Sequence, residues 1–351
     1  MKLAFISNNY GKTYDAIGVF AKVIAENLPD NCTYDVYSAD CRDDHSSKIQ
    51  RMFNMGMTME IFKASKGVTK RKYNAVLMDY PFMEWNPLIL VAFKILSICS
   101  KKKSTALILT LHEYERASRL RKIVSEQLCK MADVVMVSSN ETGKIIEKFN
   151  KNWFSIELPV NISNYSGNYS NIKPNRKQYV YMGLVNKTKA FTEMLAGWDL
   201  FNQNDEYCLN IITASELGDI EKEHKGIKYL HMASDEMLMN VMRESVFCIL
   251  PIIPAVEERN GSYKSACIAG CISIGFFCDK FRDFNFTYHI KDYEAETLAN
   301  AFKEVQSFSD NYIKNAEESA IKYGENFTPS KVSKKVIEKI EHFMNNIIER
   351  R

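Results

Sequence analysis

The sequence is poor in the residues that mark non-globular classes of protein. Its 351 residues include only 14 glycines and 8 prolines, too few for a collagen-like or low-complexity chain. Hydrophobic residues make up 46% and charged residues 25%, close to globular averages, which excludes extensive disorder. Since a typical domain has about 150 residues, the length indicates roughly two folded domains.

Long apolar runs and a strong excess of one charge are absent too. The longest apolar stretch, Pro87–Cys99, is interrupted by Lys94 and is well short of the roughly 20 residues that span a bilayer. We therefore expect no transmembrane helix. The net charge of +3 is too balanced to indicate a nucleic-acid partner by charge alone.

The N-terminus and the cysteines are typical of a cytoplasmic protein. Residues 1–11 hold an apolar run of about five residues and then a polar loop, which predicts a first β-strand and not a secretion signal. The nine cysteines form no CxxC pair. Most stand in apolar surroundings, as buried free thiols do in a reduced compartment.

Short apolar runs alternate with helical patterns through the first half of the chain. A strand over Leu3–Ser7 precedes a helix over Ala16–Leu28, whose apolar residues recur at the spacing of one helix face. Further elements are strands over Thr33–Tyr37, Ala75–Met78, Ala106–Thr110 and Val134–Val137, and a helix over Ala117–Met131. Such alternation predicts a parallel sheet covered by helices on both faces.

A second alternation follows the most linker-like stretch, which begins after Leu158–Ser163. It predicts strands over Tyr179–Met182, Leu209–Thr213, Ile227–Leu230, Val246–Leu250 and Ile272–Phe277, and helices over Ala190–Phe201, Asp235–Arg243 and Tyr263–Ala269. The run Val332–Ile348 has the pattern of one long amphipathic helix.

This order of elements predicts an α/β fold of two Rossmann-like, doubly wound domains that face a central cleft. We expect residues 1–165 and 166–328 to form the two domains. The helix within residues 329–351 is expected to pack back toward the first. Loops at the carboxyl ends of the strands would then line the ligand site.

Two loops of the first half carry residues suited to ligand binding. The loop Asn8–Thr13 joins a strand to a helix N-terminus, which attracts phosphate or carboxylate. It matches neither glycine-rich nucleotide motif, and an ordinary turn with a solvated Lys12 is the alternative. His112 follows the fourth strand beside Glu113, where an imidazole can transfer a proton or bind a hydroxyl. No pair of the six histidines has the spacing of metal ligands, so we expect no metal site.

Two loops of the second half combine small, basic and acidic residues. Gly183 ends a strand, and Lys187 and Lys189 follow before a helix, an arrangement suited to a diphosphate. The loop Ala255–Lys264 gathers carboxylates, an arginine, a glycine and hydroxyls before the helix that ends at Gly270. Solvated lysines and a charged surface loop are the alternatives.

Taken in order, these features resemble the GT-B-fold glycosyltransferases, most closely the family-4 type of retaining enzymes that use nucleotide-sugar donors. The similarity extends over nearly the whole chain and depends on the order of its parts. The matching segments are Gly11, Leu109–Glu113, Ala132–Ser139, Leu158–Asn161, Tyr181–Gly183, Lys189–Ala190, Leu250–Pro251, Glu257 and Cys267–Gly270.

The resemblance implies roles for single residues, with the acceptor in the first domain and the donor in the second. Catalytic positions would be His112 and Glu257, the latter contacting donor-sugar hydroxyls and not acting as a nucleophile. Donor-binding positions would be Gly183, Lys187, Lys189, Glu258, Asn260, Gly261, Ser262, Tyr263 and Ser265. Acceptor-binding positions would be Asn9, Gly11, Lys12, His112 and Glu113. The nucleotide sugar is a substrate here, and the resemblance requires no metal or other cofactor.

The sequence departs from the family pattern at two donor positions. Leu184 stands where the family usually has an arginine, and Ser265 stands where it has the second glutamate of its E-x7-E pair. The first hypothesis is transfer of a sugar from a nucleotide donor to a saccharide or lipid-linked saccharide, in surface polysaccharide biosynthesis. The second, motivated by these departures, is a catalytically degenerate GT-B protein that binds or stabilises a partner transferase. A nucleotide-sugar epimerase is the third.

A basic and apolar region of the first half indicates contact with a membrane surface. The apolar helix Pro87–Cys99 is followed by Ser100–Lys103, and before the adjacent strand stand Lys63, Lys66, Lys70, Arg71 and Lys72. Cations beside an apolar element attract anionic lipid headgroups. The alternative is a buried core helix with a solvated basic end. We therefore expect a cytoplasmic protein with peripheral contact at the inner face of the membrane, as would suit a lipid-linked acceptor.

Overall fold

The computed structural model divides the chain into two compact units. It describes residues 1–12, 15–40, 55–70, 73–82, 86–160, 172–186 and 188–350, without the side chains of residues 116 and 346–350. One unit comprises Met1–Leu158 with Pro329–Arg351, and the other comprises Pro159–Thr328. The expected boundary after residue 165 lies outside the described residues.

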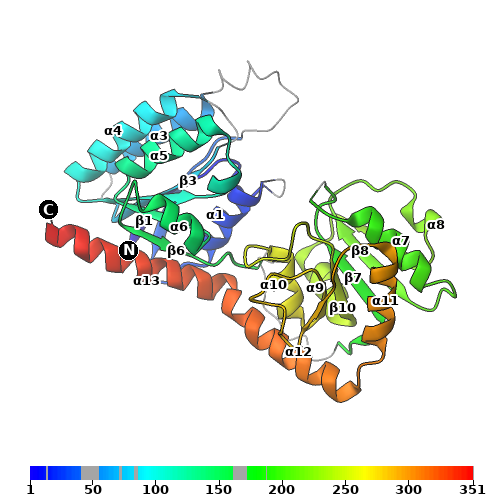
Figure 1. Cartoon of the computed structure of the whole chain (residues 1–351). Coiled ribbons are helices and arrows are strands. Elements are labelled where there is room, and N and C mark those ends of the chain that lie inside the picture. The colour runs from blue at the N-terminus through cyan, green and yellow to red at the C-terminus, as the bar shows by residue number, and fades with distance from the viewer. Residues whose placement is uncertain are drawn as a thin grey trace. The chain divides into compact units, whose positions relative to one another are not determined.

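The first unit is a six-stranded parallel sheet with the strand order β2-β1-β3-β4-β5-β6 in the described part of the chain (Figure 1). Its strands are β1 (Lys2–Ile6), β2 (Thr33–Tyr37), β3 (Ala75–Tyr80), β4 (Ala106–Leu111), β5 (Val134–Val137) and β6 (Trp153–Ser155). Its helices are α1 (Ala16–Glu26), α3 (Gly56–Lys70), α4 (Leu88–Lys102), the 3-10 turn η1 (Tyr114–Arg116), α5 (Arg119–Met131), α6 (Asn140–Ile146) and α13 (Pro329–Arg350).

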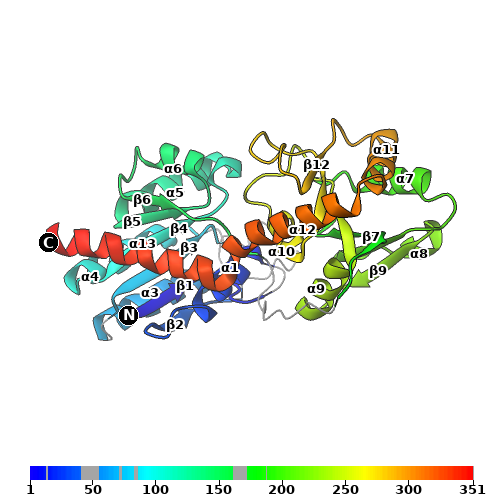
Figure 2. The same cartoon turned by 90° about the horizontal axis from the view of Figure 1, so that it is seen from below.

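Helices cover both faces of this sheet. Leu3 and Phe5 of β1 pack with α1 and α13, while Ala4 and Ile6 pack with α3, α4 and α5, because successive side chains of a strand point to opposite faces. Figure 2 shows α13 lying along the face that α1 covers. The inner strands β3, β4 and β5 are buried at every residue and are mostly apolar, as in other parallel sheets.

The C-terminal helix α13 belongs to the first unit. Its side chains in the apolar core of this unit are Val332, Val336, Ile337 and Ile340. The Ser333 hydroxyl donates a hydrogen bond to the Ile24 carbonyl in α1, at 2.9 Å. Lys335 pairs with Glu157 at 3.3 Å. These contacts attach a segment from the far end of the sequence to the first β-α pair.

The second unit is also a six-stranded parallel sheet within the described residues, with the order β12-β11-β10-β7-β8-β9. Its strands are β7 (Asn175–Met182), β8 (Cys208–Thr213), β9 (Ile227–His231), β10 (Ser245–Leu250), β11 (Ile272–Gly275) and β12 (Thr287–His289). Its helices are α7 (Phe191–Phe201), α8 (Ile220–Glu223), α9 (Asp235–Glu244), α10 (Gly261–Ala269), α11 (Ala295–Gln306), α12 (Asp310–Gly324) and the turn η2 (Glu325–Phe327).

The expected α/β class with two Rossmann-like sheets is confirmed. Some helices and strands differ from the sequence prediction in where they begin or in whether they were predicted. Helix α10 begins at Gly261, so Gly261 and Ser262 form its first turn, where the sequence predicts a loop. Strands β6 and β12 have three residues each, too few for their pattern to be recognised. No helix in the described ranges is both long enough and apolar enough to cross a bilayer.

Candidate functional site

Each sheet has one point where its strand order reverses. In the first unit it lies between β1 and β3, and in the second between β7 and β10. At such a point the following loops diverge to opposite faces of the sheet and leave a crevice, where α/β proteins bind ligands. The predicted site residues follow β1, β4, β7 and β10. They therefore lie at or next to the two switch points.

Asp15 ties the loop after β1 to the N-terminus of α1. Its Oδ2 accepts hydrogen bonds from the side-chain amides of Asn8 and Asn9, at 2.5 and 2.9 Å. Its Oδ1 accepts from the backbone N–H groups of Ile17 and Gly18, which caps the helix,. A Cβ at Gly18 would stand 2.2 Å from the Asn9 carbonyl oxygen. Only glycine at this position allows the loop to fold this closely onto the helix.

The other predicted acceptor residues of this loop lie nearer the solvent. Gly11 donates its N–H to the Gly18 carbonyl at 3.0 Å, and Lys12 donates its N–H to the Asn9 carbonyl at 2.8 Å. The Lys12 side chain is exposed. Thr13, the last residue of the predicted loop, lies outside the described residues.

The carboxylate that pairs with His112 is Asp79, and this corrects the expectation that Glu113 is the carboxylate beside it. The His112 Nε2 and Asp79 Oδ1 atoms are 3.4 Å apart, and the two residues are only 9% and 5% exposed. Parallel pairing of β3 with β4 sets Asp79 opposite Thr110. A hydrogen bond from the His112 N–H to the Tyr80 carbonyl, at 2.8 Å, continues this pairing beyond the end of β4. Glu113 is exposed and has a left-handed backbone with φ 52°.

Phe20 of α1 contacts the His112 ring edge to face, with the ring centroids 5.2 Å apart. The helix that Asp15 caps therefore also supports the imidazole. Nearby strand ends hold buried oxygens without a hydrogen-bond partner among the described residues, namely Ser7 Oγ, Asn8 Oδ1 and Thr110 Oγ1. Because buried polar atoms are normally paired, these oxygens can serve a polar ligand or water at this edge of the sheet.

Backbone hydrogen bonds join the loops that follow β7 and β10. The Ala190 N–H donates to the Pro251 carbonyl at 2.8 Å, and the Ile253 N–H donates to the Thr188 carbonyl at 2.9 Å. These bonds flank Lys189 and hold its backbone at the carboxyl ends of the two strands. The backbone of a lysine is thus fixed beside the second switch point.

The side chain of Lys189 is partly buried, and burial lowers the pKa of its ammonium below the usual range,. No carboxylate in the described ranges pairs with it. Helix α7 begins two residues later without a side-chain cap, so its first N–H groups also favour an anion. Gly183, with φ 142°, directly follows β7 at the same edge. Lys187 lies outside the described residues.

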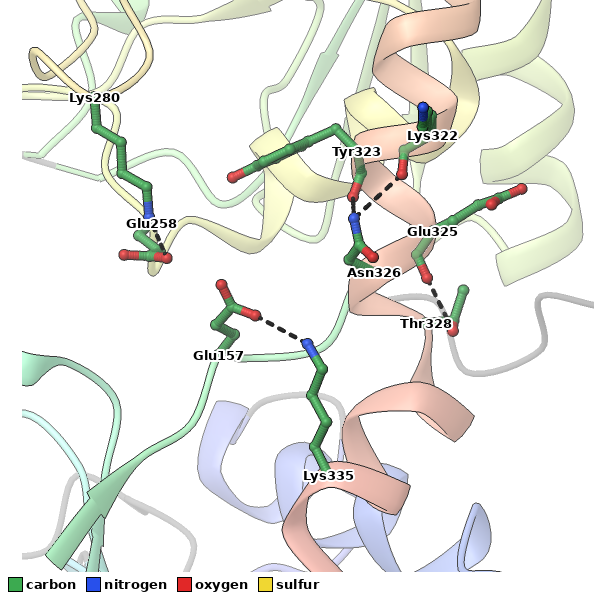
Figure 3. Close-up of polar contacts among 9 residues, drawn as sticks. All are labelled: Glu157, Glu258, Lys280, Lys322, Tyr323, Glu325, Asn326, Thr328 and Lys335. Carbon is green, nitrogen blue, oxygen red and sulfur yellow. Dashed lines mark hydrogen bonds and ion pairs between the residues drawn. The ribbon is translucent and has the colours of Figure 1, made fainter. Parts of the chain in front are cut away.

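The predicted acidic residues of the loop before α10 are paired. Glu257 forms an ion pair with Arg259 at 2.7 Å, and its N–H donates to Asn260 Oδ1 at 2.6 Å. Glu258 pairs with Lys280 at 2.6 Å (Figure 3). Solvent reaches both ion pairs, and pairs of this kind stabilise a protein by less than about 1 kcal/mol. A ligand with hydroxyl groups can therefore replace either ion pair at little cost in free energy.

Tyr263 and Ser265, both predicted to bind the donor, lie in the core. The Tyr263 ring packs against Phe277 and Phe281, with centroids 5.5 and 5.1 Å away, and Ser265 is fully buried. Helix α10 packs against both α9 and α12, which leaves only its first turn open. The predicted donor residues that solvent reaches are Gly183, Lys189, Glu257, Glu258, Asn260, Gly261 and Ser262.

Three charged residues in these regions escaped the sequence reasoning. Asp15 could have been found from its place one residue before a helical pattern, because aspartate is a preferred N-cap. Asp79 needed the register between two strands. Lys264 is fully buried, with its ammonium 4.4 Å from the centre of the Phe327 ring, and no local pattern marks it. Within the described residues, no three His, Cys, Asp or Glu side chains are grouped to hold a metal ion.

Comparisons with known proteins give matches in structure alone. No protein-family model and no curated protein sequence matches the chain. A glycosyltransferase from Rickettsia africae superposes with a TM-score of 0.69 at 12% identity, covering 98% of this chain and 99% of that one. Anabaena HepE in complex with UDP gives 0.66 at 13% identity, covering 97% and 100%. An α-glucosyltransferase in complex with UDP-glucose and DNA containing an abasic site gives 0.66 at 14% identity, covering 97% and 99%.

The fold of the chain is therefore the GT-B fold of these glycosyltransferases. The resemblance inferred from the sequence is confirmed at this level. Assignment to the family-4 type stays a prediction.

Proposed function

We propose that the protein is a glycosyltransferase that moves a sugar from a UDP-sugar donor to a hydroxyl group of a saccharide or lipid-linked saccharide, with retention of configuration. The observation that carries the proposal is Lys189. A partly buried ammonium without a carboxylate partner in the described ranges stands at the switch point of the second unit. Structural neighbours with the same fold are described with UDP or UDP-glucose bound.

In this proposal the second unit binds the donor. The diphosphate contacts Lys189, Lys187 and the first N–H groups of α7, and Gly183 lets the phosphates approach the backbone. Departure of the nucleotide leaves negative charge on its diphosphate. These groups are already in position before the reaction and stabilise that charge as it develops. Glu257, Glu258, Asn260, Gly261 and Ser262 bind the hydroxyls of the donor sugar. No step of this proposal calls on a metal.

The first unit binds the acceptor in this proposal. The reacting hydroxyl lies between the loop Asn9–Lys12 and His112, whose imidazole accepts its hydrogen bond and takes its proton. The hydroxyl attacks the sugar from the face that UDP leaves, so the bond from sugar to diphosphate breaks as the glycosidic bond forms and the configuration is retained. Asp79 fixes the orientation of the ring. Glu113, the exposed residue next to His112, also binds the acceptor. Support comes from the enclosed contact between His112 and Asp79 and from the unpaired buried oxygens beside it. The biological setting we propose is surface polysaccharide biosynthesis in the cytoplasm.

A catalytically degenerate GT-B protein that supports a partner transferase is the second candidate. Its support is specific to two positions. Ser265, at the place of the second glutamate in the family pattern, is fully buried, and Leu184, at the place of an arginine, is exposed. A donor would then find fewer polar contacts than the family provides.

A thermal-shift screen tests these functions first, because a ligand that binds only the folded state raises its stability. The panel consists of UDP, GDP, ADP, CMP and their common sugar conjugates. Stabilisation by UDP, with slow release of free sugar from one UDP sugar, supports the transferase. Stabilisation by none of them favours the degenerate partner. Conversion of a nucleotide sugar into an isomer without any acceptor would identify an epimerase.

A further inference from the structure

Helix α4 presents a row of aliphatic side chains to the solvent. The row consists of Leu88, Val91, Ile95 and Ile98, which are 45%, 51%, 38% and 44% exposed. Their spacing of three, four and three residues places them on one face of the helix. The opposite face lies in the core, through Ile89, Ala92, Phe93 and Leu96. A helix that covers a sheet in water normally carries polar residues on its outer face. This row therefore indicates contact with an apolar partner.

The row lies in the middle of a layer of three helices. Helix α4 packs against α3 on one side and α5 on the other, and Figure 1 shows the three together over one face of the first sheet. Helix α5 adds Leu120 and Ile123, which are 59% and 53% exposed. We call these two residues and the row on α4 the apolar patch.

The three helices of this layer are rich in cations. Helix α3 carries three lysines, helix α4 carries three lysines, and helix α5 carries two lysines and two arginines. These ten cations compare with two carboxylates on the same helices, Glu60 and Glu126. Glu60 pairs with Lys63 at 2.5 Å, and Glu126 accepts a hydrogen bond from the Tyr114 hydroxyl. The whole chain has a net charge of only +3. The positive charge of this layer is therefore a local concentration.

We propose that the layer α3–α4–α5 is a docking surface for an anionic lipid bilayer. The aliphatic side chains of the apolar patch enter the boundary between headgroups and acyl chains, and the flanking lysines bind lipid phosphates, as in interfacial amphipathic helices. A second copy of the chain fits less well, because a symmetric contact would set the two cationic layers against each other.

The position of α4 links this surface to the acceptor region. The helix begins at Leu88, shortly after the carboxyl end of β3 that carries Asp79. Docking therefore brings lipid headgroups to the edge of the sheet where the loop after β1 and His112 lie. A lipid-linked saccharide could reach this edge from the bilayer, a consequence that rests on the proposed function, whereas docking itself does not.

Co-sedimentation of the full chain with vesicles tests docking. One set of vesicles is phosphatidylcholine alone, and the other contains about 30% phosphatidylglycerol. We expect sedimentation with the anionic vesicles at low salt, little with the neutral ones, and release as salt screens the lysines. Absence of binding to anionic vesicles at low salt would overturn the proposal.

Two sets of variants locate the surface. Val91→Ser, Ile95→Ser and Ile98→Ser combined should weaken the partition coefficient by about tenfold or more. Their matched control exchanges exposed apolar residues of the other unit, Leu200→Ser, Met232→Ser and Met237→Ser, and should bind as the wild type does. Lys94→Gln, Lys101→Gln and Lys102→Gln combined should weaken binding by roughly a hundredfold, at about fivefold for each charge. Lys225→Gln, Lys228→Gln and Lys314→Gln combined are the control for charge.

Further measurements distinguish loss of docking from loss of folding, self-association and loss of UDP binding. Circular dichroism should show the same helix content in all variants, because every changed side chain is exposed. Equal vesicle binding by the serine variant of α4 and the wild type would place docking elsewhere and overturn the proposal. A wild-type dimer that dissociates in that variant, with no vesicle binding, would reassign the patch to self-association. UDP binding should be unchanged in all variants, so a failed docking test leaves the proposed function standing, and the reverse also holds.

Discussion

Asp79 Oδ1 and His112 Nε2 lie 3.4 Å apart although 33 residues separate them in the chain. Parallel pairing of β3 and β4 brings the two together at adjacent strand ends, and burial excludes most water from them. A carboxylate in contact with one ring nitrogen fixes the orientation and the tautomer of an imidazole. The pair thus has the form of an acid-base group with its positioning residue.

Replacing His112 tests this role. His112→Ala should lower kcat/KM for transfer by about a hundredfold or more, the usual contribution of a general base, and leave UDP affinity unchanged. Asp79→Asn should lower the rate by less, because the imidazole remains. The double variant should be no slower than His112→Ala alone if Asp79 acts only through His112.

The same three variants need a stability control. Urea unfolding should place each of them close enough to the wild type that the assay measures folded protein. If Asp79→Asn slows transfer equally with and without His112, Asp79 acts independently and the pairing has no catalytic meaning. Loss of UDP binding in His112→Ala would place the histidine in the donor site.

Lys189 gives the protein a pH dependence with a definite sign. Burial lowers its pKa in the folded state, whereas an unfolded lysine titrates near 10.4. Between the two values the unfolded chain binds more protons than the folded chain, so this lysine makes the unfolding free energy rise with pH across that window. Below the folded-state pKa both states are protonated, and its contribution no longer changes with pH. Lys189→Met should remove this component. Urea unfolding of both proteins over that window checks it, and parallel curves would contradict it.

The core position of Tyr263 and Ser265 predicts effects on stability and not on donor binding. Tyr263→Phe and Ser265→Ala should each leave UDP affinity within about twofold of wild type, because neither side chain is exposed,. Tyr263→Ala should destabilise the protein by about 3–5 kcal/mol through the cavity it leaves. Urea unfolding and a UDP titration measure the two effects. A large loss of UDP affinity in Tyr263→Phe at unchanged stability would place the hydroxyl in the site.

The attachment of α13 to the first unit can be tested at Ile340. Ile340→Ala should destabilise the protein by about 2–5 kcal/mol, the cost of removing a buried aliphatic side chain, because Ile340 lies in the core with β1 and α1. Ile123→Ala removes the same atoms from an exposed position and should change stability by less than about 0.5 kcal/mol. Equal melting temperatures of the two variants would show that α13 does not contribute to this core.

The sequence predicted the strands best where burial leaves an unambiguous pattern. The segments Ala75–Tyr80 and Ala106–Leu111 are buried at every residue, and each begins with an uninterrupted apolar run, Ala75–Met78 and Ala106–Leu109. His112 was found because it directly follows one of them. Asp79 was missed because its partner depends on the register between two strands, which no local pattern contains.

Helix α10 shows the opposite case. Tyr263–Ala269 is buried at every residue, so it lacks the polar face that would show which side chains point toward the loop. The family pattern then assigned Tyr263 and Ser265 to the donor, although packing between neighbouring helices encloses both. The pairing of Glu257 with Arg259 was likewise beyond reach, because a run of charges does not specify which of them meet.

A calorimetric titration with UDP tests the central claim most directly. We predict saturable binding at one site in the wild type, about tenfold or more weaker binding in Lys189→Ala because one contact to the diphosphate is lost, and unchanged binding in Lys314→Ala, which removes an exposed lysine of the same unit. Absence of UDP binding up to millimolar concentration, or equal affinity of Lys189→Ala and the wild type, would contradict the placement of a nucleotide donor at the second switch point.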